Sequence, residues 1–210
     1  MRCHNHAITV LNTPALRQAI GTRLGMVLTP ELAASIEIAA HIEPDNSIDP
    51  ARFQPQQHGQ YTFAIERMRD IMAEIKLQHL AHWGETEKYR HGLPFAPMYD
   101  EMLADEHRGL RLQFTVRDAL GTLAGNLAMY LGRSRHSGTV FAREDTLYFA
   151  PEHRGGMTVV AFLRYAEPVL HSLGAREIRV DSKLVNRADV LMRRLGYSAV
   201  SMQFVKIFEE

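Results

Sequence analysis

The segment from Thr146 to Thr158, TLYFAPEHRGGMT, constrains the fold of this chain more than any other. Residues Asp145 to Ala150 have the apolar and aromatic content of a strand, and a helical apolar stripe begins at about Met157. A short turn with two adjacent glycines separates them. Glycine allows close approach of backbone to a ligand, and a helix N-terminus carries partial positive charge. The segment therefore suits a phosphate or pyrophosphate group.

Strand and helix patterns alternate on both sides of this segment. The predicted elements are strand 61–65, helix 68–82, a short helix 98–107, strands 110–117, 123–131 and 145–150, helix 157–173, strand 177–181, helix 187–195, and one or two strands within 197–208. Hairpins are here mixed with a strand–helix–strand crossover. This order predicts an α/β (α+β) fold with a mixed, mostly antiparallel twisted sheet flanked by helices.

Two of these elements carry finer expectations. In strand 110–117, apolar residues alternate strictly with Arg111, Gln113, Thr115 and Arg117, which predicts one buried and one solvated face. Within helix 157–173, Pro168 is expected to kink or split the helix, because its ring clashes with the carbonyl four residues earlier.

The N-terminal quarter of the chain has a different texture. Thr13-Pro14 and Thr29-Pro30 each precede a short apolar helical pattern, and Thr and Pro suit the first positions of a helix. Residues 43–59 carry three prolines and few large apolar groups, as in a linker. We therefore expect a small helical arm at 1–45, a linker at 46–60 and the main domain at 61–210.

Composition restricts the function classes. Lys+Arg and Asp+Glu both total 24 in 210 residues, so the formal charge is zero, which argues against a general nucleic-acid binder. A single cysteine, Cys3, fits a reducing compartment. No apolar run approaches a membrane span, and the N-terminus lacks a secretory signal, so we expect a cytoplasmic protein without a membrane partner. Although His4 and His6 follow Cys3, no metal site is predicted.

Two motifs carry a resemblance to a known family. His153–Thr158, HRGGMT, resembles the pyrophosphate loop [Q/R]-x-x-G-x-[G/A] of the GNAT superfamily of N-acyltransferases, and it lies between a strand and a helix as that loop does. Asn186–Tyr197 resembles the family's N-x-x-A-x-x-[LF]-[YC]-x-x-x-G-[FY] run. The resemblance covers about residues 61–208. The segment around His82-Trp83 also resembles GNAT proteins of tailed phages and prophages.

The resemblance implies acyl transfer, with acetyl-CoA as donor and the amine of a small molecule or protein as acceptor. Pantetheine would enter where strands 145–150 and 177–181 splay apart, and a backbone N–H near Phe149 would stabilise the thioester oxyanion. The cofactor-binding residues that it implies are Leu147, Tyr148, Phe149, His153, Arg154, Gly155, Gly156, Met157, Thr158 and Asn186.

An ammonium acceptor must lose a proton before it attacks, so the site needs a base. The candidates are Glu144 and Asp145 at the head of strand 145–150, and His82, which with Glu85 could instead line the acceptor pocket. Each has an ordinary alternative, a solvated strand start for the carboxylates and a backbone-satisfied helix end for His82. Met192 stands where the family has a tyrosine that protonates the thiolate, which leaves solvent, Tyr197 or Tyr148 for that role.

Two other functions stay open. A non-catalytic GNAT-fold module could bind CoA, or no ligand, and act as an interaction protein, which the methionine at position 192 favours. A phage-type nucleic-acid-modifying relative is favoured by the basic residues of the predicted loop 132–144, Arg133, Arg135, His136 and Arg143. A homodimer is an open option. Thermal-shift measurements with acyl-CoAs would discriminate among these functions.

Overall fold

The computed structural model describes residues 20–41, 45–88, 94–155, 157–183 and 188–207. The chain forms two compact units, Met1–Asn46 and Ser47–Glu210. The first unit contains α2 (Pro30–His41), and Thr29 Oγ1 accepts a hydrogen bond from the Leu32 N–H at 3.2 Å. The Thr29 cap is therefore confirmed, whereas the helix start at Thr13-Pro14 lies outside the described residues.

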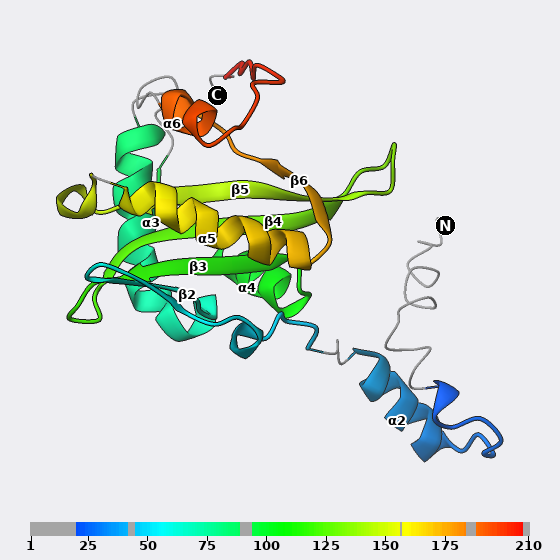
Figure 1. Ribbon diagram of the computed structural model, residues 1–210. Helices are drawn as coiled ribbons and strands as arrows, with labels where there is room; N and C mark the ends of the chain where they lie inside the picture. The colour runs from blue at the N-terminus through cyan, green and yellow to red at the C-terminus, as the bar shows by residue number, and fades with distance from the viewer. Residues whose placement is uncertain (1–19, 42–44, 89–93, 156, 184–187, 208–210) are drawn as a thin grey trace. The chain divides into compact units, whose positions relative to one another are not determined.

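The second unit is built on one six-stranded sheet in the order β1-β2-β3-β4-β5-β6 (Figure 1). Its strands are β1 (Gln56–His58), β2 (Tyr61–Ile65), β3 (Arg111–Arg117), β4 (Leu123–Arg133), β5 (Val140–Phe149) and β6 (Ala175–Arg179). The first four pairings are antiparallel and the β5–β6 pairing is parallel. The predicted mixed, mostly antiparallel sheet is confirmed.

Helices cover both faces of the sheet. The crossover helix α5 (Thr158–Ser172) lies on one face, and α3 (Met72–Thr86), which continues the short η3 (Met68–Ile71), lies with α4 (Tyr99–His107) on the other (Figure 1). The last helix is α6 (Ala188–Arg194). In the part of the chain that the structure describes, no helix is long and apolar enough to cross a membrane.

The main core lies between α5 and the sheet. Phe162 of α5 is fully buried against Phe63 of β2 and Phe149 of β5, with ring centroids 5.3 and 5.7 Å away. Burying one such side chain contributes roughly 1.5–3 kcal/mol. The prediction that Pro168 splits this helix is wrong, because α5 is continuous from Thr158 to Ser172. Buried residues before and after the proline, among them Tyr165 and Leu170, anchor both halves of the helix to the same core.

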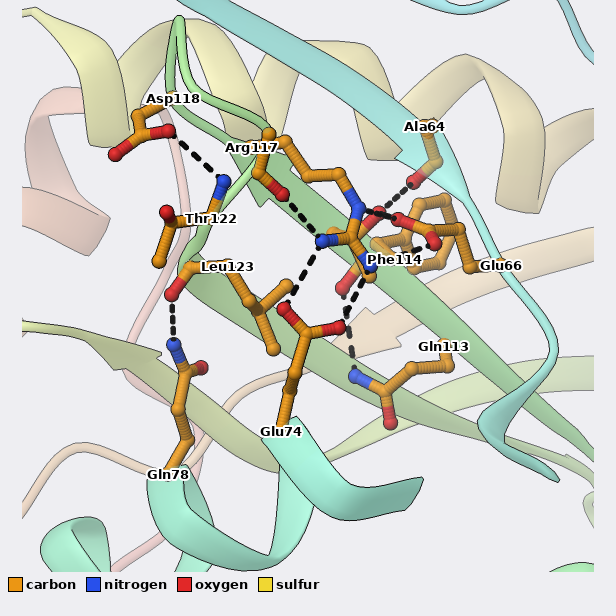
Figure 2. A network of polar contacts seen from close by, with 12 residues as sticks. Ala64, Glu66, Glu74, Gln78, Gln113, Phe114, Arg117, Asp118, Thr122 and Leu123 are labelled. Atoms are coloured by element: carbon orange, nitrogen blue, oxygen red, sulfur yellow. Dashed lines mark hydrogen bonds and ion pairs between the residues drawn. The ribbon is translucent and has the colours of Figure 1, made fainter. Parts of the chain in front are cut away.

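The other face of the sheet is also buried, so the half-solvated strand predicted for 110–117 is wrong. Six of the seven β3 residues are buried, because α3 and α4 cover its polar side. The polar side chains there pair with each other. Arg117 donates to Glu66 and Glu74 at 2.8–3.0 Å and to the Gly121 carbonyl at 2.6 Å (Figure 2). A charged network replaces solvent on this face.

Three other parts of the unit also differ from the sequence prediction. Strand β1 and the short η2 (Pro50–Arg52) lie inside the predicted linker. The predicted basic loop 132–144 is mostly strand, because β4 extends to Arg133 and β5 begins at Val140. Residues 197–207 contain no strand, and their apolar side chains Val200, Met202 and Phe204 are exposed. Charged residues at 143–145 had interrupted the apolar pattern on which the β5 prediction rested.

Candidate functional site

The sheet opens between β5 and β6. Their parallel pairing runs from Val140↔Ala175 to Arg143↔Arg179, where β6 ends. Strand β5 continues to Phe149, so in the described part of the chain its edge from residue 144 onward has no neighbouring strand. This opening lies where the sequence predicted that the two strands splay apart.

The backbone groups of Phe149 point into the opening. Ala150 N–H donates to the Ala124 carbonyl, toward β4, at 2.9 Å. Successive strand residues direct their backbone groups to opposite edges, so the N–H and carbonyl of Phe149 face away from β4. The Phe149 carbonyl accepts there from Arg154 Nε at 2.7 Å.

A β-bulge marks the same stretch of β5. Ala128 pairs with Thr146 but Met129 pairs with Glu144, so Asp145 is an extra residue without a partner in β4. Bulges bend a strand and redirect its side chains, and they are frequent beside active sites. The bulge lies at the two carboxylates that the sequence singled out.

A cavity of about 230 Å³ lies beside this part of β5. Its lining comes from α3, from β5, from the residues after β6 and from α6. The three predicted catalytic candidates, Glu144, Asp145 and His82, all line it. The fold therefore brings together residues that are more than 60 positions apart in the sequence.

The electrostatics distinguish the two carboxylates. Burial, together with the nearby charges of Asp181 and Asp145, raises the pKa of Glu144 from its ordinary 4.5 to about 7. The Asp181 N–H donates to Glu144 Oε2 at 3.1 Å, which lowers the pKa in part. Glu144 is half-buried, whereas Asp145 is exposed. A carboxylate that titrates near neutrality can take up and release a proton at physiological pH.

His82 is poorly suited to hold a positive charge. Burial, and then the ammonium of Lys183, lower its pKa below the ordinary 6.5. Its ring stands edge-on to Tyr148, with centroids 6.0 Å apart. The lowered pKa disfavours the protonated imidazole, which forms part of the cavity wall.

The predicted phosphate loop connects β5 to α5. After η4 (Pro151–His153), Gly155 has φ = 145°, a backbone conformation that favours glycine. The first hydrogen bond into α5 joins the Ala161 N–H to the Met157 carbonyl, so the N–H groups before Ala161 have no acceptor inside the helix. Thr158 is the first helical residue. Such groups form an anion-binding helix start. Gly156 lies outside the described residues.

Of the other predicted cofactor-binding residues, Leu147 lines the cavity and Met157 is exposed, while Tyr148 is buried. His153 Nδ1 is hydrogen-bonded to the Tyr61 hydroxyl at 3.1 Å, which ties the loop to β2. Asn186 lies outside the described residues.

Arg154 lies across the opening instead of extending into solvent. Its Nη2 is 2.7 and 2.9 Å from the two carboxylate oxygens of Glu85 on α3, and its guanidinium lies 5.3 Å from the centroid of the Tyr148 ring. With the bond to Phe149, these contacts hold α3 against the open edge of β5. In this arrangement Arg154 occupies the strand edge that the sequence assigned to pantetheine.

Met192, which stands in the family's tyrosine position, and Tyr197, an alternative proton donor, lie in different surroundings. Met192 is buried and lines the cavity. Tyr197 donates to Glu167 of α5 at 2.9 Å, and burial followed by this bond raises its pKa. Tyr197 therefore binds to α5 and does not line the cavity.

Four titratable residues of the cavity were not predicted from the sequence, namely His79, Glu87, Asp181 and Lys183. Lys183 Nζ contacts Glu87 Oε1 at 2.6 Å across 96 positions. A long-range pair has no local sequence signal, although His79 could have been noticed three residues before His82, on the same face of a helix.

Comparisons with known proteins give a fold and no closer relative. No protein-family model matches the chain, and no curated protein sequence matches it significantly. Solved structures do match. A ribosomal-protein-alanine N-acetyltransferase from Brucella melitensis superposes with a TM-score of 0.58 at 18% identity, covering 71% of this chain and 99% of that one.

Two further structures give the same result. An aminoglycoside acetyltransferase from an uncultured soil metagenomic sample matches with a TM-score of 0.55 at 18% identity, over 71% of this chain and 99% of that one. A GNAT family acetyltransferase from Staphylococcus aureus matches with 0.51 at 12% identity, over 71% and 99%. At these identities the likeness establishes the fold, which is that of GNAT acetyltransferases. The resemblance to phage proteins stays a prediction.

Proposed function

We propose that this chain is an acyl-CoA-dependent N-acyltransferase that transfers an acetyl group from acetyl-CoA to a primary amine, with Glu144 as the base. The observation that carries the proposal is the cavity at the opening between β5 and β6, which places a carboxylate of pKa about 7 beside a free strand edge. The shared fold with acetyltransferases supports it.

The described residues fit acyl-CoA. The amide groups of pantetheine need strand-like hydrogen-bond partners, which the backbone of Phe149 provides once Arg154 moves aside. Phosphates need N–H groups and cations, which the start of α5, Gly155 and Arg154 provide. When bound, acetyl-CoA supplies an acyl thioester that a neutral amine attacks directly.

The residues of the cavity prepare the acceptor. Glu144 takes one proton from the incoming ammonium, directly or through a water molecule, and so leaves the nitrogen with a free lone pair. His82 has a lowered pKa, which disfavours a positive charge on its ring beside the carboxylates. As the C–N bond forms and the C–S bond breaks, the nitrogen loses its second proton and the thiolate gains one. Met192 cannot donate a proton, so we propose that solvent carries this proton from the nitrogen to the thiolate.

The test of cofactor binding is thermal unfolding with and without acetyl-CoA. A ligand at 100 times its Kd that binds only the native state adds about 2.7 kcal/mol of stability. Gly155→Val should abolish the shift, because a β-branched residue does not adopt φ = 145°. Gly138→Val is the matched control, since Gly138 has φ = 69° in the turn at the other end of β5. A wild-type protein without a shift at millimolar acetyl-CoA would contradict the proposal.

The test of catalysis is release of free thiol from acetyl-CoA with a panel of amines. Glu144→Gln should lower kcat by roughly 10²–10⁴-fold, and the wild-type rate should fall below a pKa near 7 as Glu144 is protonated. An equal rate in Glu144→Gln would assign the base to another residue. A thermal shift with acetyl-CoA without turnover of any amine would favour the non-catalytic binding module.

A further inference from the structure

The cavity beside Glu144 is strongly acidic. The part of its lining that the structure describes contains four carboxylates and one ammonium, from Glu87, Glu144, Asp145, Asp181 and Lys183. The ammonium of Lys183 pairs with Glu87 at 2.6 Å, and Asp181 pairs with the exposed guanidinium of Arg143 at 3.2 Å. The excess negative charge of the cavity therefore lies at Glu144 and Asp145. The carboxylate of Asp145 has no hydrogen-bond or ion-pair partner among the described residues. An anionic pocket concentrates cations and disfavours anions.

The carboxylates also act on each other. The charges of Asp181 and Asp145 both raise the pKa of Glu144, so the three groups lie close enough to repel. A bound cation would relieve this repulsion. Gathering like charges in a half-buried cavity costs free energy. A cationic ligand would remove this repulsion on binding, which would increase its affinity.

His79 gives an independent indication of a ligand. Its side chain is 6% exposed and lines the cavity, yet its Nε2 has no hydrogen-bond partner in the described structure. Burial, and then the charge of Arg111, lower its pKa to about 4, so the ring is neutral. A buried polar atom without a partner is costly, and an amine of the ligand would supply one.

The remaining walls suit a short hydrocarbon chain. The rings of Trp83 and Phe95 both line the cavity, and their centroids are 5.8 Å apart. Aromatic faces bind methylene groups and also attract ammonium ions. The volume of about 230 Å³ lies just below the roughly 300–1,000 Å³ of pockets for drug-sized ligands. The acceptor is therefore small.

We infer that the acceptor is a short aliphatic diamine or polyamine, whose first nitrogen is deprotonated at Glu144 while its second ammonium is bound by Asp145 and His79. The inference rests on the proposed function for the reaction, but the binding preference that it states can be measured alone. The competing occupant is an amino acid, because Arg111 is buried near His79 and has N–H groups without partners. Arg111 does not line the described cavity. The carboxylates that do line it outnumber its one ammonium, and they would repel the carboxylate of an amino acid.

The experiment compares three acceptors that have the same number of carbon atoms and different ends, 1,4-diaminobutane, n-butylamine and 4-aminobutyrate. Calorimetry without acyl-CoA should give binding about tenfold tighter for the diamine than for the monoamine, as expected for one hydrogen bond to a charged group. 4-Aminobutyrate should bind most weakly. Tighter binding of 4-aminobutyrate, or equal binding of all three, would overturn the inference.

Two variants change the charge of the cavity in opposite directions. Asp145→Asn should reduce the diamine-to-monoamine preference to about threefold or less, and Lys183→Met should increase it about twofold or more by removing one positive charge from the cavity wall. Glu101→Gln, which removes an exposed carboxylate of α4 away from the cavity, should leave the ratio unchanged. Ratios that are unaffected by Asp145→Asn would overturn the inference.

Turnover separates the two proposals. If the diamine binds preferentially but is not acetylated in the presence of acetyl-CoA, the acceptor site stands and the proposed reaction fails. If n-butylamine or 4-aminobutyrate is acetylated with a higher kcat/KM than the diamine, the reaction stands and the acceptor class is wrong.

Discussion

Replacing Glu144 by Gln should stabilise the protein at pH 8 while it impairs catalysis. The pKa of Glu144 is raised from 4.5 to about 7, so the folded protein binds a proton that the unfolded chain has already released. Stability is therefore lost as the pH rises from about 4.5 through 7, and the loss is complete above that range. Gln resembles the protonated carboxyl and does not titrate.

The magnitude follows from linkage. A shift from 4.5 to about 7 costs the wild type about 2.5 kcal/mol between pH 5 and pH 8. Because Glu144 is half-buried, solvent screens part of this, and about 1–2 kcal/mol is expected. For a unit of this size, 1 kcal/mol corresponds to roughly 2–4 °C in Tm. The variant should thus gain about 2–8 °C over the wild type on going from pH 5 to pH 8.

The assay is thermal unfolding of both proteins at the two pH values, followed by circular dichroism. The other titrations are common to both proteins and cancel in the difference. Glu101→Gln is the control, because its exposed carboxylate should give no pH-dependent difference. A Glu144→Gln protein with the same Tm relative to wild type at pH 5 and pH 8 would refute the raised pKa, and with it the choice of Glu144 as base.

Three more predictions concern other parts of the chain. Glu85→Gln should release Arg154 and lower the Kd for CoA by up to about fivefold, the equivalent of one exposed ion pair, as measured by calorimetry; weaker binding would show that the ion pair helps the site. Arg117→Met should lower the free energy of unfolding by about 1.5–3 kcal/mol in urea at pH 7, because two carboxylates lose their partner, and an unchanged midpoint would contradict this. We also propose that residues 198–207 form a homodimer contact, so that Val200→Asp with Phe204→Asp turns a dimer into a monomer in sedimentation; a wild-type monomer would exclude it.

Local patterns predicted the elements that have a single apolar face. The stripe of α5 and the alternation in β3 gave the correct structure type at nearly the correct bounds. They did not reveal what covers the polar side of β3. Arg117 pairs with Glu66, which follows β2, and with Glu74 of α3, and both lie more than 40 positions earlier in the sequence. A charged residue predicted as solvated is in fact half-buried among its partners.

For the candidate site too, local patterns suggested individual residues but not their surroundings. The residue types at the head of the strand identified Glu144 and Asp145, but a charged start is usual for a solvated strand too. What raises the pKa of Glu144 is burial beneath segments that follow β6, and the partner of Arg154 is a glutamate of α3. Both depend on tertiary neighbours for which one sequence gives no signal.

The departure of β6 from β5 explains the main properties of the site together. If the ladder continued beyond Arg143↔Arg179, the N–H of Asp181 would bond to the backbone of β5. It bonds instead to the side chain of Glu144 at 3.1 Å. A backbone donor must find an acceptor when the ladder stops, and Glu144 supplies it. The carboxylate that accepts this hydrogen bond is half-buried beside the opening. There its pKa rises, and the edge of β5 that leads to Phe149 is covered by the side chain of Arg154 and not by a strand among the described residues.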